Sequence, residues 1–286
     1  MSTTAQRAET QISRRPAMPN EPAPTPPVDA ADIIATDRRA TTRGASPRQL
    51  ARIAGALYLV NVLAGAFAIG YVQTTLFGAD SATTAANIQS HQVLYRSGLA
   101  AHVVVTVTNV PLALIFYQLF KNVHRRLALL TAFFILVATA IEAAGIPSQF
   151  APLVLLADGA GSTLPPAQLQ TLAALTGQLA HVDYTVYTVF FGLDILCLAY
   201  LVLQSRFLPR TIGVLLAIDG LAYLIYSFTQ ILAPGFATIL VPWIQLPAPL
   251  GEGALSLWLL VFGVNTQRWP TKRATAGPVR QVQTPK

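Results

Sequence analysis

Ionisable side chains lie inside an apolar segment of this chain. Residues 181–200 read HVDYTVYTVFFGLDILCLAY, in which His181, Asp183 and Asp194 stand among residues suited to lipid. On a helix that turns about 100° per residue, an offset of 11 residues returns to about 20°, so the two aspartates share one face. A charged side chain at mid-bilayer costs about 2.5–3.5 kcal/mol on insertion scales, and it usually faces the bundle interior or water. The segment therefore predicts a polar interior.

Other apolar runs carry similar polar residues, and their depths fall into two levels. The outer third of the runs holds Arg96, His102, Glu142, His181, Asp183 and Glu252. The middle and inner half holds Asn61, Asn109, Asp194 and Asp219. The outer set mixes cationic, anionic and imidazole groups, which predicts a site for a cationic or zwitterionic ligand or an ion. The inner set could relay protons, or only join helices through hydrogen bonds worth about 0.6 kcal/mol each.

The polar residues do not have the spacing of a known catalytic or metal-binding motif. The sequence contains no G-x-S-x-G elbow, Walker motif or dinucleotide fingerprint, and its one cysteine is Cys197. His102, Glu142, His181 and Asp183 offer a suitable mixture of N and O donors, but H-E-x-x-H spacing is missing. We therefore predict no catalytic residue, no cofactor and no metal site.

The elements that position these residues follow from composition. Of the 286 residues, 53% are hydrophobic and 11% are charged, against about a quarter charged in soluble domains. Several apolar runs reach the length of about 20 residues that a helix needs to cross a bilayer. The expected spans are residues 51–72, 97–120, 127–149, 179–203, 211–232 and 244–264. Because the runs do not alternate with period two, the sequence predicts an all-α polytopic membrane protein with a six-helix transmembrane bundle.

Basic residues gather on one side of this six-helix arrangement. Apart from Arg96, every Lys and Arg precedes the first span, stands at its start as Arg52 does, or follows the second, fourth or sixth span. The positive-inside rule therefore places both termini in the cytoplasm. The net charge is +7, but because the basic residues gather at the ends of the expected spans, it does not indicate a nucleic-acid partner.

Polar tails flank the expected transmembrane domain, residues 48–265. Residues 1–47 are rich in proline and poor in large apolar residues, which predicts a disordered tail, and residues 266–286 form a second polar tail. The basic cluster in residues 38–52 stands beside the first span. There we expect contact with anionic lipid headgroups, in preference to docking of a partner.

One outer segment predicts a helix longer than a membrane is thick. Pro165 and Pro166 open the run LPPAQLQTLAALTGQLAH, which leads into the fourth span. An unbroken helix over residues 166–203 would measure about 57 Å, against a hydrocarbon core of about 30 Å. We therefore expect a break near Gly177. The part before it, with the proline-rich FATILVPWIQLPAP, would form either a lid or a passive cover.

Several segments carry a family resemblance. These are LFGADSATTAANIQSHQVLYRSG, RRLALL, FFGL, SRFLPRTIGVLLAIDGLAYLI and LSLWLLVFGV. Together they resemble the bacterial membrane-protein family catalogued as domain of unknown function 4386, over about residues 50–265. Asp80, Thr84 and Asn87, the most specific part together with Arg96, could also cap a short helix. The resemblance implies a helical architecture in a bacterial inner membrane and implies no reaction.

Three functions agree with these features. We favour a bundle that binds or moves a small solute, ion or lipid through an outward-facing polar cavity. An intramembrane enzyme acting on a lipid-borne substrate would use Glu142, His102, His181 or Asp183 in acid and base roles. A non-catalytic scaffold would recruit a partner through its basic tails. A deep, water-connected cavity would favour the first two functions, and a dry, hydrogen-bonded core would favour the third.

Overall fold

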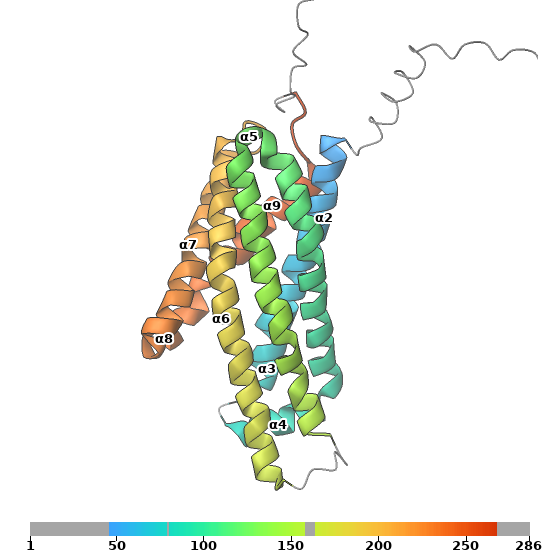
Figure 1. Ribbon diagram of the computed structural model, residues 1–286, viewed down its shortest axis with the longest axis vertical. Coiled ribbons are helices and arrows are strands. Elements are labelled where there is room, and N and C mark those ends of the chain that lie inside the picture. The colour runs from blue at the N-terminus through green and yellow to red at the C-terminus, as the bar shows by residue number, and fades with distance from the viewer. Residues whose placement is uncertain (1–45, 79, 158–163, 268–286) are drawn as a thin grey trace, which may run out of the picture. The chain divides into compact units, whose positions relative to one another are not determined.

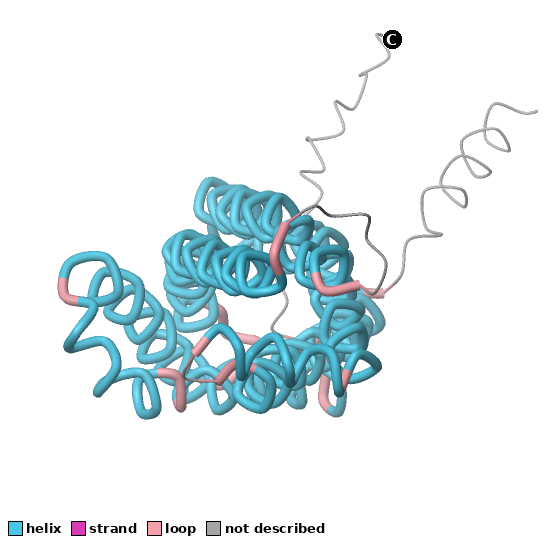
Figure 2. Tube along the Cα trace, turned by 90° about the horizontal axis from the view of Figure 1, so that it is seen from below, coloured by secondary structure: helices cyan, strands magenta, loops and turns pink. Residues whose placement is uncertain are grey.

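Helices make up all regular structure in the part of the chain that the structure describes, residues 46–78, 80–157 and 164–267 (Figure 1). This structure is a computed structural model. Figure 2 shows in a second view that the described loops between helices are short. The elements are α2 (Pro47–Gly65), the π-helical η1 (Ala66–Gln73), α3 (Thr74–Leu76), α4 (Ser81–Ser90), α5 (Gln92–Leu155), α6 (Pro166–Gln204), α7 (Arg210–Leu232), α8 (Pro234–Ile244) and α9 (Pro247–Val261).

Four helical segments are long and apolar enough to cross a membrane. They are Pro47–Leu76, which joins α2, η1 and α3, then Gln92–Leu155, Pro166–Gln204 and Arg210–Leu232. The predicted all-α class is therefore confirmed for the described residues. The predicted tails, residues 1–47 and 266–286, lie almost entirely outside these residues.

Helix α5 consists of two antiparallel arms. They meet at His124, whose φ of −152° and ψ of 97° are not helical. The Leu127 amide donates to Nδ1 of His124 over 3.1 Å, which provides a partner for an amide in the first turn of the second arm. Near the far ends of the arms, the Tyr95 hydroxyl donates to the Gln149 carbonyl over 2.6 Å. The arms match the expected spans 97–120 and 127–149.

Helix α6 is continuous over 39 residues, so the predicted break near Gly177 is wrong. The reason is that its first turns pack against protein. Ala173 is buried in an apolar cluster with Leu76 of α3 and Ile88 of α4. The ring of Phe77 covers Gly177, where an added Cβ would lie 2.6 Å from Cε1 of that ring. These contacts support a helix about 58 Å long at 1.5 Å per residue.

Asp80, Thr84 and Asn87 hold the short helix α4 in place. The Thr83 amide donates to Oδ1 of Asp80 over 2.7 Å, and this hydrogen bond lowers the pKa of Asp80. Thr84 accepts from the Gly78 amide over 3.0 Å, and Asn87 donates to the Leu76 carbonyl over 3.2 Å. Asp80 therefore caps α4, as the sequence suggested, whereas Thr84 and Asn87 tie the helix to residues 76–78.

Small residues allow close helix crossings. A Cβ added to Gly192 of α6 would lie 3.1 Å from the Gly220 carbonyl oxygen of α7, and one added to Gly220 would lie 2.9 Å from the Gly192 carbonyl oxygen. The hydroxyls of Thr188 and Ser227 join the same two helices over 2.8 Å. At Gly55 an added Cβ would collide with the backbone of α9. Close approach of this kind is typical of helices packed within a membrane.

One end of the bundle gathers the basic connections. The start of α2, the bend of α5 and the α6–α7 connection lie together at the top of Figure 1. Phe120, near the bend, lies 5.6 Å from Phe207 between ring centroids, and the Arg52 side chain donates to the Val261 carbonyl over 3.3 Å. Among the described Lys and Arg residues, Arg96 alone belongs to the opposite end, where α4 lies.

Candidate functional site

Two neighbouring cavities lie between the helices. The larger has a volume of about 350 Å³ and lies toward α3 and the first half of α6. The smaller has a volume of about 190 Å³ and lies nearer the middle of the bundle. Ile69, His102, Tyr184 and Gln245 line both cavities, so the two adjoin. Every described helix except α4 contributes residues to their walls.

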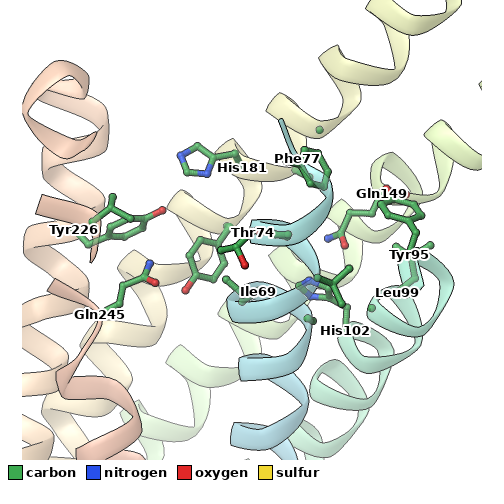
Figure 3. Close-up of a pocket in the computed structure, with 18 residues that line it drawn as sticks. Ile69, Thr74, Phe77, Tyr95, Leu99, His102, Gln149, His181, Tyr226 and Gln245 are labelled. Carbon is green, nitrogen blue, oxygen red and sulfur yellow. Dashed lines mark hydrogen bonds between the residues drawn. The ribbon is translucent and has the colours of Figure 1, made fainter. Parts of the chain in front are cut away.

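The larger cavity has an apolar and aromatic wall with neutral polar groups (Figure 3). Tyr226 and Gln245 lie on one side, and Tyr95, Gln149 and His102 lie on the other. No Lys, Arg, Asp or Glu of the described residues lines it. Such a wall suits a molecule with an apolar body that needs a few hydrogen bonds for orientation.

His102 and Glu142 form a pair in the wall of the smaller cavity. The two side chains come from opposite arms of α5, with Nδ1 of His102 lying 3.5 Å from Oε1 of Glu142. Within the described residues, Nε2 of His102 and Oε2 of Glu142 are buried and have no hydrogen-bond partner. Because unpaired buried polar atoms are costly, these two atoms are available to a bound molecule.

Glu252 supplies a second carboxyl group to the smaller cavity. The Tyr223 hydroxyl donates to its Oε1 over 3.0 Å, which joins α7 to α9. Asp194 and Asp219 lie close enough to interact electrostatically with Glu252. Both aspartates are at most 2% exposed, and Oδ1 of each has no hydrogen-bond partner among the described side chains and backbone. The interior is therefore rich in carboxyl groups.

Asn61 and Asn109 link α2 to the first arm of α5. Nδ2 of Asn61 donates to Oδ1 of Asn109 over 2.9 Å, to Oγ1 of Thr108 over 3.0 Å and to the Val105 carbonyl over 3.1 Å. Asn61 also lines the smaller cavity. These hydrogen bonds join the two helices without a ligand, although Nδ2 of Asn109 is buried and has no hydrogen-bond partner among the described residues.

Aromatic rings line the smaller cavity beside the carboxyl groups. Tyr184 stacks on Tyr187 with ring centroids 5.9 Å apart, and Tyr187 stacks on Phe191 at 5.2 Å. At the end of this stack, the rings of Phe191 and Tyr223 make an edge-to-face contact with their centroids 5.2 Å apart. The wall therefore offers both aromatic surface and acidic groups.

The structure brings part of the predicted outer set together. His102, Glu142 and Glu252 line the smaller cavity, and His181 is an exposed residue of the larger cavity. Arg96 is exposed and lines neither cavity.

Asp183 also lies outside both cavities. It is half-buried against Gly145 of the second α5 arm, where an added Cβ would lie 2.7 Å from its Oδ2. Within the inner set, Asn61 and Asn109 bond to each other, whereas Asp194 and Asp219 lie near Glu252.

The polar residues of the larger cavity that sequence reasoning missed include Tyr184, Gln149 and Gln245. Tyr184 was detectable, because Tyr184, Tyr187 and Phe191 follow helical spacing. Gln149 stands at the end of an expected span, where a polar residue signals only a boundary. Gln245 lies between α8 and α9, in a turn whose course a periodic pattern does not describe.

The fold and the site define a class, that of helical proteins suited to a membrane with a polar cavity inside the bundle. In the described ranges, no group of three or more His, Cys, Asp and Glu side chains is arranged to hold a metal ion. The chain belongs to the family described as "Domain of unknown function (DUF4386)", which matches residues 53–263. No curated protein and no solved structure matches it.

Proposed function

We propose that this protein binds or moves a small solute or ion through its two adjoining cavities. The observation that carries the proposal is the pair of unpartnered atoms, Nε2 of His102 and Oε2 of Glu142, in the wall of a cavity. A scaffold held together by interhelical hydrogen bonds would need contacts such as that of Asn61 with Asn109. It would have no use for unpaired polar atoms beside a cavity.

The proposal includes a placement in the membrane. The bundle would cross it six times, with α2–η1–α3, the two arms of α5, α6, α7 and α9. Basic residues at the end that holds the α5 bend support a cytoplasmic position for that end and for both termini, in a bacterial inner membrane. The larger cavity then opens toward the outside, and the basic cluster before α2 meets anionic lipid headgroups.

Helix α9 is a short crossing in this arrangement. Its 15 residues span about 22 Å, less than the hydrocarbon thickness of about 30 Å. It therefore begins within the membrane at Pro247, directly beside the smaller cavity, which Ala248 and Pro249 line. Interrupted helices at binding sites are a recurring feature of membrane transporters.

Water access to the larger cavity tests the proposal. We would first replace the native thiol by Cys197→Ser, then introduce Gln245→Cys or Thr74→Cys in the cavity wall. Ile218→Cys, on an exposed apolar face of α7, is the matched control. A membrane-impermeant methanethiosulfonate added from outside should label the two cavity positions and leave the control unlabelled. If both cavity positions are as unreactive as the control, the proposal fails.

Native mass spectrometry of the purified protein complements this test. A retained small molecule or ion should be released from the native chain and missing from a Glu142→Leu, Glu252→Leu double variant. Arg96→Gln, outside both cavities, is the control and should retain it. Equal retention by the double variant would place the bound species elsewhere.

A further inference from the structure

From the chemistry of the walls we infer that the ligand is a small organic cation, an ammonium group carried on an apolar body. This inference rests on the proposed function and names the ligand class of the same site. The ammonium group would occupy the smaller cavity, between Glu142, Glu252 and the aromatic rings, and the apolar body would occupy the larger cavity.

Charge selects against an anion in the smaller cavity. Glu142 and Glu252 line it, and no Lys or Arg among the described residues lines either cavity. The nearest helix start, that of α9, supplies few amide donors, because Pro247 and Pro249 have no N–H. The Ala248 amide already donates to the Gln245 carbonyl over 3.3 Å. A phosphate or carboxylate would therefore meet carboxyl groups, with no lysine or arginine among the described lining residues and few helix-start amides to compensate its charge.

Aromatic surface favours a cation over a neutral polar group. A cation over the face of a tyrosine or phenylalanine ring gains about 0.5–1 kcal/mol at exposed sites and about 2 kcal/mol when desolvated. Tyr184, Tyr187, Phe191 and Tyr223 all line the smaller cavity. Two stacked contacts and one edge contact hold these rings in place. Rings combined with carboxyl groups are the chemistry that recognises ammonium ligands.

The adjoining volumes match an amphipathic molecule. The larger cavity presents apolar side chains such as Ile69, Val72 and Leu99, which suit an aliphatic or aromatic body. Oε2 of Glu142 has no partner among the described residues and can accept a hydrogen bond from an ammonium N–H. Because His102 and Tyr184 line both cavities, one molecule can contact both at once.

Binding of matched cations and neutral analogues to the full-length protein in detergent tests the inference. The probes are choline and hexylamine, each compared with an uncharged counterpart. For choline this is dimethylbutanol, in which a tert-butyl group replaces trimethylammonium, and for hexylamine it is hexanol. Isothermal titration should give at least one cation a dissociation constant lower than that of its counterpart by about tenfold or more.

Variants separate the contribution of the carboxyl groups to cation binding from that of the aromatic rings. Glu252→Gln should weaken binding of the cation by about tenfold or more, whereas Asp183→Asn, which changes a carboxyl group outside both cavities, should leave it unchanged. Tyr187→Phe keeps the aromatic face and should retain binding, while Tyr187→Leu should weaken it. Size-exclusion chromatography identifies any variant that fails to fold. If Glu252→Gln fails to fold, the comparison of Tyr187→Phe with Tyr187→Leu tests the inference instead.

Each contrary result has a distinct meaning. Equal affinity for a cation and its neutral counterpart overturns the inference and leaves a solute-binding cavity in place. Failure of every cation to bind also overturns it. If the cysteines at positions 245 and 74 are nevertheless labelled, the proposed function survives; if they are inert, both fail together.

Discussion

Tyr223 of α7 donates a hydrogen bond to Glu252 of α9 inside the wall of the smaller cavity. The contact connects a helix long enough to cross a membrane with one of only 15 residues. It holds a carboxyl group in a fixed position although the start of α9 is irregular. The hydrogen bond therefore contributes both to packing and to the shape of the cavity.

We expect Tyr223→Phe to lower the free energy of unfolding by about 1–3 kcal/mol, because Glu252 loses a donor and remains buried. Glu252→Gln should cost less, since its amide oxygen can still accept from Tyr223. Thermal unfolding in detergent would compare the two variants with the native chain. A Tyr223→Phe variant as stable as the native chain would mean that the hydrogen bond makes no net contribution to the free energy of unfolding.

We expect Gly220→Ala to destabilise the α6–α7 crossing by about 1–3 kcal/mol. The new Cβ would lie 2.9 Å from the Gly192 carbonyl oxygen, which is backbone and cannot move aside without moving α6. Gly253→Ala in α9 is the matched control, because nothing lies within 4 Å of its Cβ position. It should be neutral or slightly stabilising through helix propensity. Equal losses in both variants would show that backbone freedom, rather than contact, matters at Gly220.

Asn61 and Asp194 should differ in their effect on stability. Asn61→Leu removes a donor with partners on α5, so it should cost about 1–3 kcal/mol. Asp194→Asn should be nearly neutral, because Oδ1 of Asp194 already has no partner among the described residues. Chemical or thermal unfolding in the same detergent measures both. A large loss for Asp194→Asn with none for Asn61→Leu would reverse our assignment of the packing residue.

The topology predicts which fusions are active in the periplasm. Alkaline phosphatase joined after Arg126 or Arg206 should be inactive, because both sites belong to the basic end, which we propose faces the cytoplasm. The same enzyme joined after Gln149 should be active and serves as the positive control. Activity after Arg126 or Arg206 would contradict the six-helix arrangement.

The position of each polar residue along its helix was predictable from the sequence, but the direction of each side chain was only partly so. Arg96 and His102 lie within two turns of each other, yet their offset of six residues turns them about 120° apart on a helix, so only His102 reaches a cavity. Asp183 is turned about 100° from Tyr184, which lies on the cavity side of α6. Periodicity located helices well because long apolar runs have few alternative structures.

Tertiary contacts account for what the sequence reasoning did not predict. The expected break near Gly177 came from comparing one helix with the thickness of a bilayer, whereas α3 and α4 cover the first turns of α6. The aromatic wall required knowing that Tyr223 of α7 meets Phe191 of α6. Such contacts depend on how the helices cross. A glycine such as Gly192 permits a close crossing, but the sequence does not say which helix crosses there.

The unequal lengths of α6 and α7 give the larger cavity an uneven border. Helix α6 has 39 residues and α7 has 23, and both meet at the basic end, so α6 continues about 24 Å beyond α7 at the other end. On one side the cavity is backed by the tall assembly of α4, α5 and α6, and on the other by the lower turn around α8 (Figure 1). In the proposed orientation this low side faces the plane of the outer leaflet. An amphiphilic ligand of the kind we propose would then enter from the side, without first leaving the membrane surface for bulk water.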